Sequence, residues 1–214
     1  MIIVAGGIKG GSGKTTVATH LTVMRALQGR DVLLVDADDQ ETATDFTALR
    51  NERQPEGAGY TSIKLTGASV RTETLRLTKK YEDVVIDTGG RDTTSQRAAL
   101  TVANKLIVPF VPRSFDVWTL EKVARLVEEM RAANPRLQAY VFINRADPQG
   151  RDNDEAAELL REAGGLEYLD TPIGARKAFG NAASQGLAVT ELKQQDPKAT
   201  QEISALFRYL FDIL

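Results

Sequence analysis

The segment at residues 9–16, Lys-Gly-Gly-Ser-Gly-Lys-Thr-Thr, constrains this chain more than any other. It follows an apolar run at residues 2–5 and opens a segment with helical spacing, which is the context of a phosphate-binding loop. Its glycines let the backbone turn tightly, so that N–H groups can approach phosphate oxygens. The positive end of the helix dipole would point at the same anion. The segment therefore predicts a nucleotide-phosphate site.

Individual side chains of this loop have separate expected roles. Lys14 can reach the β- and γ-phosphates of ATP, and the Thr15 hydroxyl can ligate Mg²⁺. ATP and Mg²⁺ are therefore the cofactors that we expect. The predicted ATP-binding residues of the loop are Gly10, Gly11, Ser12, Gly13, Lys14, Thr15 and Thr16.

Short β-branched runs alternate with helical segments along the rest of the chain. Several runs are apolar throughout, which is typical of strands buried on both faces of a parallel sheet. We predict an α/β fold of three layers, with helices on both sides of a mostly parallel, twisted central sheet. The 214 residues suit one domain spanning residues 1–214. The expected strands are residues 2–5, 32–35, 62–65, 84–86, 106–111 and 140–143; the clearest helices are 15–28 and 118–133, and loops are expected at 51–59 and 147–154.

Composition excludes several classes of function. The chain has no cysteine, which excludes zinc–thiolate sites, iron–sulfur clusters and thiol nucleophiles. A net charge of −2 means that any affinity for DNA must come from a local basic patch. No run approaches the roughly 20 apolar residues that cross a bilayer, and no signal peptide is evident. We expect a cytoplasmic protein.

Acidic residues follow two of the expected strands. Asp36, Asp38 and Asp39 come after the run at 32–35, and Asp87 ends the run at 84–86. The carboxyl ends of parallel strands form the edge at which ligands bind in open α/β sheets. Carboxylates near phosphate need a cation, so these acids strengthen the expectation of Mg²⁺.

The loop closely resembles the deviant Walker A box of the ParA/MinD group of ATPases. A standard Walker A box has glycine where this chain has Ile8, and this group carries a second, signature lysine, here Lys9. The resemblance implies a P-loop NTPase that forms a face-to-face homodimer around two ATP molecules. Lys9 of one subunit would reach the phosphates of its partner's nucleotide and act, with Lys14 and Asp38, in catalysis.

The same resemblance assigns roles to residues outside the loop. Asp36 would support the Mg²⁺ shell beside Thr15, and Asp38 would position the attacking water, although Asp39 stands where the family usually has proline. Asp87 would contact Mg²⁺ through water. Two further assignments concern the nucleotide itself: the N–H of Gly90 would sense the γ-phosphate, and the amide of Asn144 would read adenine. The segment 108–114, which contains Pro109 and Pro112, resembles one that flanks the base and the dimer contact.

Three functions are considered for such an ATP switch: DNA binding, membrane association and metabolic synthesis. ParA proteins bind DNA of any sequence on the nucleoid, and Arg176 and Lys177 are candidate phosphate contacts. A small basic adaptor of the ParB kind would then stimulate slow hydrolysis and link the protein to a plasmid, chromosome or protein organelle. The alternative is a membrane-associated MinD-like protein, which needs a basic amphipathic tail. A metabolic synthetase would need a second substrate site, for which no motif is present.

Three other features are expected to have structural roles. His20, the only histidine, lies one turn beyond Thr16 and belongs to no catalytic arrangement. Trp118 begins an amphipathic helix and is expected to pack. The tail at residues 202–214 has an apolar stripe but a single base, Arg208. We therefore expect the tail to dock on the core rather than on a membrane.

Overall fold

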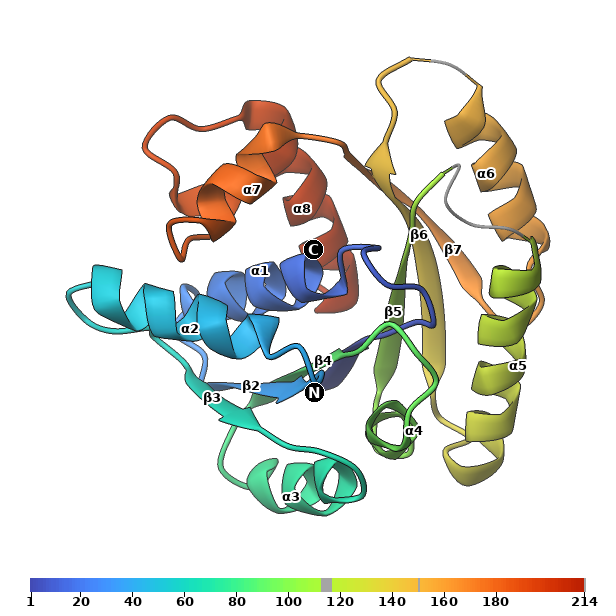
Figure 1. Cartoon of the computed structure of the whole chain (residues 1–214), viewed down its shortest axis with the longest axis horizontal. Coiled ribbons are helices and arrows are strands. Elements are labelled where there is room, and N and C mark those ends of the chain that lie inside the picture. Colours follow the sequence, from blue (N-terminus) through green and yellow to red (C-terminus); the bar gives the residue numbers. More distant parts are fainter. Residues whose placement is uncertain (113–116, 150, 214) are drawn as a thin grey trace.

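A computed structural model describes residues 1–112, 117–149 and 151–213, with the side chain at position 117 excepted. It contains one sheet of seven strands in the order β3-β2-β4-β1-β5-β6-β7 (Figure 1). Every described pair of neighbouring strands is parallel. The strands are β1 (Ile2–Ala5), β2 (Val32–Ala37), β3 (Thr61–Lys64), β4 (Asp83–Thr88), β5 (Lys105–Phe110), β6 (Gln138–Ala146) and β7 (Glu167–Gly174).

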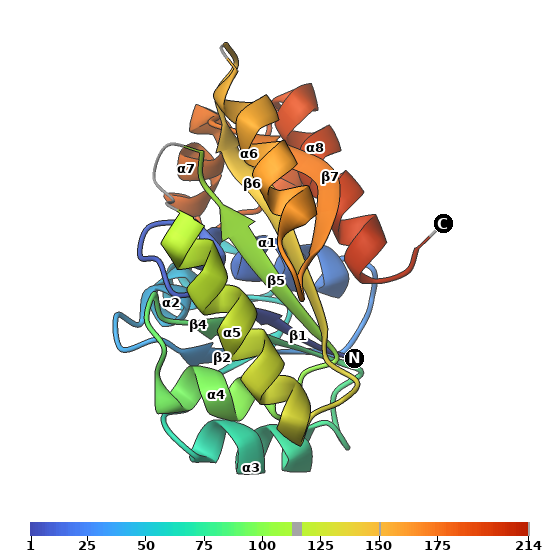
Figure 2. The same ribbon diagram turned by 90° about the vertical axis from the view of Figure 1, so that its right-hand side faces the viewer.

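Helices cover both faces of the sheet, which confirms the predicted three-layer α/β/α architecture (Figures 1 and 2). One face carries α1 (Lys14–Ala26), α2 (Thr42–Arg53), α7 (Lys177–Ala183) and α8 (Pro197–Leu210), with a 3₁₀ turn at Val189–Glu191. The other face carries α3 (Ser69–Leu77), α4 (Thr94–Leu100), α5 (Val117–Ala133) and α6 (Asp152–Glu162).

The central strands explain the continuous apolar runs of the sequence. In β1, Ile2 and Val4 face the core beneath α3–α6, whereas Ile3 and Ala5 face the core beneath α1, α2, α7 and α8. Each residue of β1, β2, β4 and β5 is buried, because both faces of these strands are covered.

The strand order places a ligand-binding position beside β1. The chain leaves β1 toward α1 and builds β2, β3 and β4 on one side, and then crosses to β5, β6 and β7 on the other. Such a reversal opens a crevice at the carboxyl ends of the strands. The glycine-rich loop follows β1 at that crevice.

Most predicted elements are present with bounds shifted by one to three residues, and three further differences affect a strand and two loops. The strand β7 was not predicted, because this edge strand buries only Leu169 and Ile173, shows no regular alternation and contains Pro172. The loop predicted at 51–59 is wrong at its start, because α2 continues to Arg53. The loop predicted at 147–154 is wrong at its end, because α6 begins at Asp152, and Gly150 lies outside the described residues.

The C-terminal segment docks on the core as predicted. Ile203, Leu206, Phe207 and Leu210 of α8 are buried against the sheet and α1. The Lys105 ammonium donates to the carbonyl oxygen of Leu210 and to the Asp212 carboxylate, which holds the end of the helix. The packing predicted for Trp118 is wrong, because its side chain is 71% exposed on α5.

A buried arginine joins α2 to the segment that precedes α8. The Arg50 guanidinium is only 6% exposed and pairs in two parallel hydrogen bonds, each 2.8 Å, with the Glu191 carboxylate. It also donates to the carbonyl oxygens of Ala58 and Gly186. Four hydrogen bonds to three separate segments make Arg50 the centre of a polar network in this layer.

His20 is a buried packing residue and not a surface residue, the other role that its sequence position allowed. Its Nδ1 donates to the Thr16 carbonyl oxygen at 2.7 Å, and its Nε2 accepts from the Val189 N–H at 3.2 Å. The ring is therefore neutral and has no nitrogen left for a second proton. Burial lowers the pKa of His20 to about 4, against the opposing effects of the Thr16 carbonyl and of Glu191.

We expect this histidine to remain neutral down to about pH 5. The unfolded chain protonates near the ordinary pKa of 6.5, so folding stability falls between pH 6.5 and pH 4. At about 1.4 kcal/mol per pH unit the loss totals about 3 kcal/mol. The single imidazole gives an unambiguous NMR signal, and its carbon and nitrogen shifts should not titrate between pH 7.5 and pH 5. A midpoint near 6.5 would contradict the buried neutral ring.

Candidate nucleotide-binding site

The glycine-rich loop has the geometry of a phosphate cradle. Gly13 occupies the N-cap position of α1 with φ 97°, a left-handed conformation that favours glycine. Space is also restricted, because a Cβ atom on Gly13 would lie 2.3 Å from Nδ2 of Asn144. Lys14 is the first residue of α1, so the loop N–H groups and the helix N-terminus converge on one cavity.

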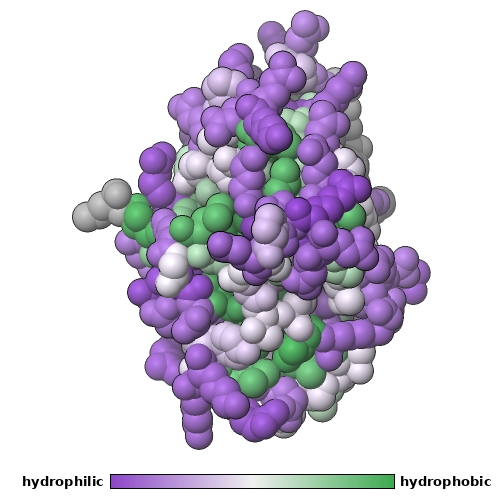
Figure 3. Space-filling view, turned by 90° about the vertical axis from the view of Figure 1, so that its left-hand side faces the viewer, coloured by the Kyte–Doolittle hydropathy of each residue, from purple (hydrophilic) through white to green (hydrophobic). Residues whose placement is uncertain are grey.

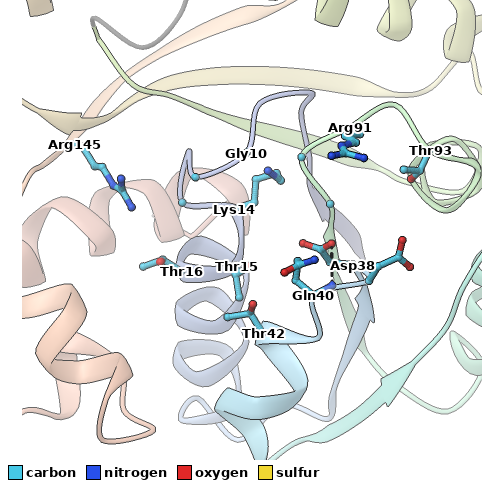
Figure 4. Close-up of a pocket in the computed structure, with 15 residues that line it drawn as sticks. Gly10, Lys14, Thr15, Thr16, Asp38, Gln40, Thr42, Arg91, Thr93 and Arg145 are labelled. Atoms are coloured by element: carbon cyan, nitrogen blue, oxygen red, sulfur yellow. Dashed lines mark hydrogen bonds between the residues drawn. The ribbon is translucent and has the colours of Figure 1, made fainter.

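This cavity, the phosphate pocket, has a volume of about 670 Å³ (Figure 4). Three loops form its walls: the glycine-rich loop, the segment after β2 and the segment after β4. Arg145 closes it on a fourth side. Its lining residues are Gly10, Gly11, Gly13, Lys14, Thr15, Thr16, Asp38, Asp39, Gln40, Thr42, Gly89, Gly90, Arg91, Thr93 and Arg145.

The Lys14 ammonium lies inside the loop. Its Nζ atom donates to the Lys9 carbonyl oxygen at 2.9 Å, and the side chain is buried. Burial lowers the pKa of Lys14 below its ordinary value, and the negative charges of Asp87 and Asp38 partly offset that effect. A cation held in this position is suited to bind phosphate oxygens.

Asp87 and Asp36 lie side by side at the ends of β4 and β2, where the two residues are paired in register. Both oxygens of Asp87 are buried and lack a hydrogen-bond partner among the described residues. Burial raises the pKa of Asp87 to about 7; Asp36 and Asp38 add to this rise, whereas Thr15 and Lys14 oppose it. An orphaned buried carboxylate beside a threonine hydroxyl fits a hard divalent cation such as Mg²⁺.

Asp36 is held differently from Asp87. Its Oδ2 accepts from the N–H and the hydroxyl of Thr44, at 2.8 and 2.7 Å, and its Oδ1 accepts from the Asp38 N–H. These bonds tie the start of α2 to the turn after β2. Asp36 therefore has a clear scaffolding role here, and its support of Mg²⁺ stays a prediction. Thr44 is a partner that the motif alone did not reveal.

Asp38 faces the segment that follows β4. A Cβ atom on Gly89 would lie 3.0 Å from Oδ1 of Asp38, and one on Gly90 would lie 2.6 Å from the Gly10 α-carbon. The backbone contact requires glycine at position 90, whereas a side chain at position 89 would press against the Asp38 carboxylate. The Gly89–Gly90 segment therefore contacts Asp38 on one side and the glycine-rich loop on the other.

A second cavity of about 380 Å³, the base-side cavity, adjoins the phosphate pocket. Gly13 and Arg145 line both cavities, and Phe179 and Ile173 give the second one apolar walls. Asn144 lies at its inner end, with Nδ2 donating to the Ser12 carbonyl oxygen at 2.7 Å. The amide thus supports the loop, and its contact with adenine stays a prediction.

Arg176 and Lys177, the candidate DNA contacts, line this second cavity. The Arg176 guanidinium pairs with the Glu202 carboxylate of α8, with Nε at 2.8 Å from Oε2. Arg176 is therefore already neutralised within the chain, whereas Lys177 is exposed. Of the two, only Lys177 presents an unpaired charge to solvent among the described residues.

The structure brings most predicted residues together and adds several. Lys9 is exposed beside the phosphate pocket, and Ser12, Asp36 and Asp87 are buried beneath it. The prediction for the segment 108–114 falls partly outside the described residues, because 113 and 114 are not among them. The pocket also contains five residues for which the sequence predicted no role, although each lies within six residues of a recognised motif: Gln40, Thr42, Arg91, Thr93 and Arg145.

Residues 2–189 match the family model described as the CobQ/CobB/MinD/ParA nucleotide binding domain. The chain belongs to this family. Its relatives include the Maintenance of carboxysome distribution protein A of Halothiobacillus neapolitanus, 25% identical over 93% of this chain and 91% of that protein. Another is the Chromosome-partitioning ATPase Soj of Thermus thermophilus, 28% identical over 89% of this chain and 88% of that protein. The family thus confirms the resemblance seen in the loop.

Solved structures of the family share this fold. The ATP complex of Cyanothece McdA(D38A) superposes with a TM-score of 0.77 at 19% identity, covering 100% of this chain and 96% of that one. The MinD of the Aquifex aeolicus MinC:MinD complex gives 0.75 at 18% identity, covering 99% and 95%. The Mycobacterium smegmatis cobyrinic acid a,c-diamide synthase with ADP and magnesium gives 0.74 at 20% identity, covering 98% and 95%. These likenesses establish the three-layer fold.

Proposed function

We propose that this chain is an ATP-hydrolysing switch that positions or partitions a cargo. The observation that carries the proposal is the convergence of Lys14, Asp38 and the orphaned Asp87 around one phosphate pocket. A cation, a carboxylate facing the pocket and a buried carboxylate suited to Mg²⁺ are the groups that phosphoryl transfer needs.

Each group has a separate task in this proposal. Lys14 and the loop N–H groups bind the β- and γ-phosphates. Thr15 and Asp87 would hold Mg²⁺, which neutralises the charge that develops on the phosphate oxygens. Asp38 holds a water in line with the γ-phosphorus, and the N–H of Gly90 senses the γ-phosphate. Hydrolysis is slow until an adaptor protein stimulates it.

Dimerisation would add a second lysine to each phosphate pocket. Lys9 is exposed, its side chain forms no ion pair with the described residues, and it lies outside the pocket of its own subunit. In a face-to-face dimer with two ATP molecules, Lys9 would reach the partner's phosphates. The dimer would also double any surface that binds DNA.

We propose that the ATP-bound dimer binds DNA of any sequence. This binding would take place in the cytoplasm, at the nucleoid. The name of the Thermus relative, Chromosome-partitioning ATPase Soj, supports this proposal, as does the exposed Lys177. A small basic adaptor of the ParB kind would connect the dimer to a plasmid, a chromosome or a protein organelle. The name of the Halothiobacillus relative, Maintenance of carboxysome distribution protein A, is consistent with a protein organelle as the cargo.

The membrane reading has less support in the structure. The apolar stripe of α8 is buried in the core, so it does not present a face to lipid. The side of the molecule that carries α2 and α7 is hydrophilic over most of its area (Figure 3). Among the described residues, no helix combines the length and apolar character of a membrane span.

We expect ATP with Mg²⁺ to produce a dimer that retains DNA of unrelated sequences, with an affinity that falls steeply as salt rises. ADP should produce neither. Lys9→Ala should bind ATP but lose both the dimer and the DNA retention, because the cation that crosses the interface is gone. Light scattering measures the dimer, and a DNA-bead assay at low salt measures retention.

The same assay separates the alternatives. Binding to anionic vesicles without DNA retention would replace this proposal with the MinD-like membrane reading. An unchanged dimer in Lys9→Ala would remove the cross-subunit role of that lysine. Arg136→Ala, which removes an exposed charge just before β6 at the opposite edge of the sheet from the phosphate pocket, is the matched control and should behave as wild type.

A further inference from the structure

Two arginines, Arg91 and Arg145, line the phosphate pocket and have no partner among the described residues. Both side chains are exposed, and neither forms a hydrogen bond or ion pair with any residue that the structure describes. Other arginines nearby are neutralised: Arg97 pairs with Asp92 and Glu129, and Arg176 pairs with Glu202. Unpaired guanidinium groups in a concave site are suited to bind an anionic ligand.

Arg91 is held at the end of the pocket that contains Asp38. It follows Gly90, which approaches the Gly10 backbone so closely that a Cβ atom would lie 2.6 Å from two of its atoms. This contact fixes the start of the Arg91 segment against the glycine-rich loop. The neighbouring Asp92 does not neutralise Arg91, because both of its oxygens accept from Arg97, at 2.8 and 2.7 Å.

Arg145 is held at the opposite end. It follows Asn144, whose amide is anchored on the Ser12 carbonyl oxygen, and it lies where the β6–β7 register is irregular. Its φ of 54° is in the left-handed region that non-glycine residues rarely adopt. Such irregularities re-aim side chains at functional sites. Arg145 lines both the phosphate pocket and the base-side cavity.

Figure 4 shows the two arginines on opposite sides of Lys14, with Asp38 on the side of Arg91. A nucleotide whose phosphates meet Lys14 would therefore extend toward Arg145 with its base and toward Arg91 with its terminal phosphate. We propose that Arg91 binds the γ-phosphate and that Arg145 binds the nucleotide where the ribose and α-phosphate join the base-side cavity. This assignment rests on the proposed nucleotide site and adds two residues to it.

Because the two arginines are assigned to different parts of the nucleotide, their substitution should affect ADP and AMPPNP affinity differently. Arg91→Ala should weaken binding of AMPPNP with Mg²⁺ by about 10-fold or more and change ADP binding by less than about 3-fold, since only AMPPNP carries a γ-phosphate. Arg145→Ala should weaken both ligands by a similar factor of about 10, because both carry the groups that it contacts. Isothermal titration calorimetry measures both affinities, and Arg136→Ala, at the opposite edge of the sheet, controls for the lost positive charge.

Several outcomes would overturn the assignment. Wild-type affinities for both ligands in Arg91→Ala would do so, as would an equal loss of ADP and AMPPNP in that variant. A loss of AMPPNP affinity seen only at concentrations where wild type dimerises would place Arg91 at the subunit contact instead. Arg91→Lys, which keeps the charge but not the planar fork, should show an intermediate loss. If wild type itself bound neither ligand, the proposed function would fail rather than this assignment.

Discussion

Asp38→Ala is expected to lower the rate of ATP hydrolysis by about 100-fold or more, while ATP binding stays intact. Asp38 lines the phosphate pocket and faces Gly89, but it does not support the glycine-rich loop. Its removal should therefore take away the group that orients the attacking water and leave the phosphate-binding N–H groups in place. The ATP-bound dimer should accumulate. Phosphate release and the dimer fraction after long incubation with ATP measure the two effects.

The neighbouring carboxylate provides a matched control for this variant. Asp39 lines the same pocket and stands where the family usually has proline. Asp39→Ala removes the same charge from the same turn, and we expect it to hydrolyse ATP near the wild-type rate. If Asp38→Ala turned over like wild type and Asp39→Ala did not, the water-positioning role would belong to Asp39.

Arg50→Ala is expected to lower the free energy of unfolding by about 3–5 kcal/mol. The substitution leaves the Glu191 carboxylate, which is 16% exposed, without its bidentate partner. It also leaves the carbonyl oxygens of Ala58 and Gly186 without a donor. Unpaired buried charges and carbonyl groups cost more than the pair contributed, because water cannot replace the lost donors. Urea unfolding followed by circular dichroism measures the change.

The same helix offers a control for Arg50. Arg53 lies three residues later, is exposed, and makes one hydrogen bond to the Ser184 carbonyl oxygen. Arg53→Ala should cost no more than about 1 kcal/mol. The two variants remove the same side chain from one helix. The difference between their losses in free energy of unfolding therefore measures the contribution of the buried Arg50 network. Equal effects would show that the Arg50 network does not stabilise the fold.

Much of the site was predictable because its chemistry lies in short contiguous motifs. The loop at 9–16 specifies its own conformation through Gly13, and buried strands carry Asp36 and Asp87 to one edge of the sheet. Residues whose roles depend on distant partners were less visible. Thr44 matters because it reaches Asp36, and Arg50 because it reaches Glu191, 141 positions away.

The surroundings of Trp118 and Arg176 were not predictable from the sequence. Trp118 was expected to pack, which is wrong, and Arg176 was a candidate DNA contact, which stays a prediction. The first is exposed and the second is paired with Glu202. Neither outcome can be inferred from local spacing, since each depends on what the fold places against the side chain. The edge strand β7 was missed for a similar reason, because its mixed burial reflects its position at the end of the sheet.

The exposure of Trp118 determines which optical methods suit this protein. It is the only tryptophan in the chain, and its indole is 71% exposed in the folded state. Unfolding will therefore change its emission little. The amplitude of the unfolding transition should be small when followed by fluorescence and large when followed by circular dichroism. A molecule that covers the start of α5 would instead shift the emission to the blue, and no other tryptophan would contribute to the signal. Trp118 fluorescence is therefore suited to detecting a ligand or partner that binds at α5, and it is poorly suited to following unfolding.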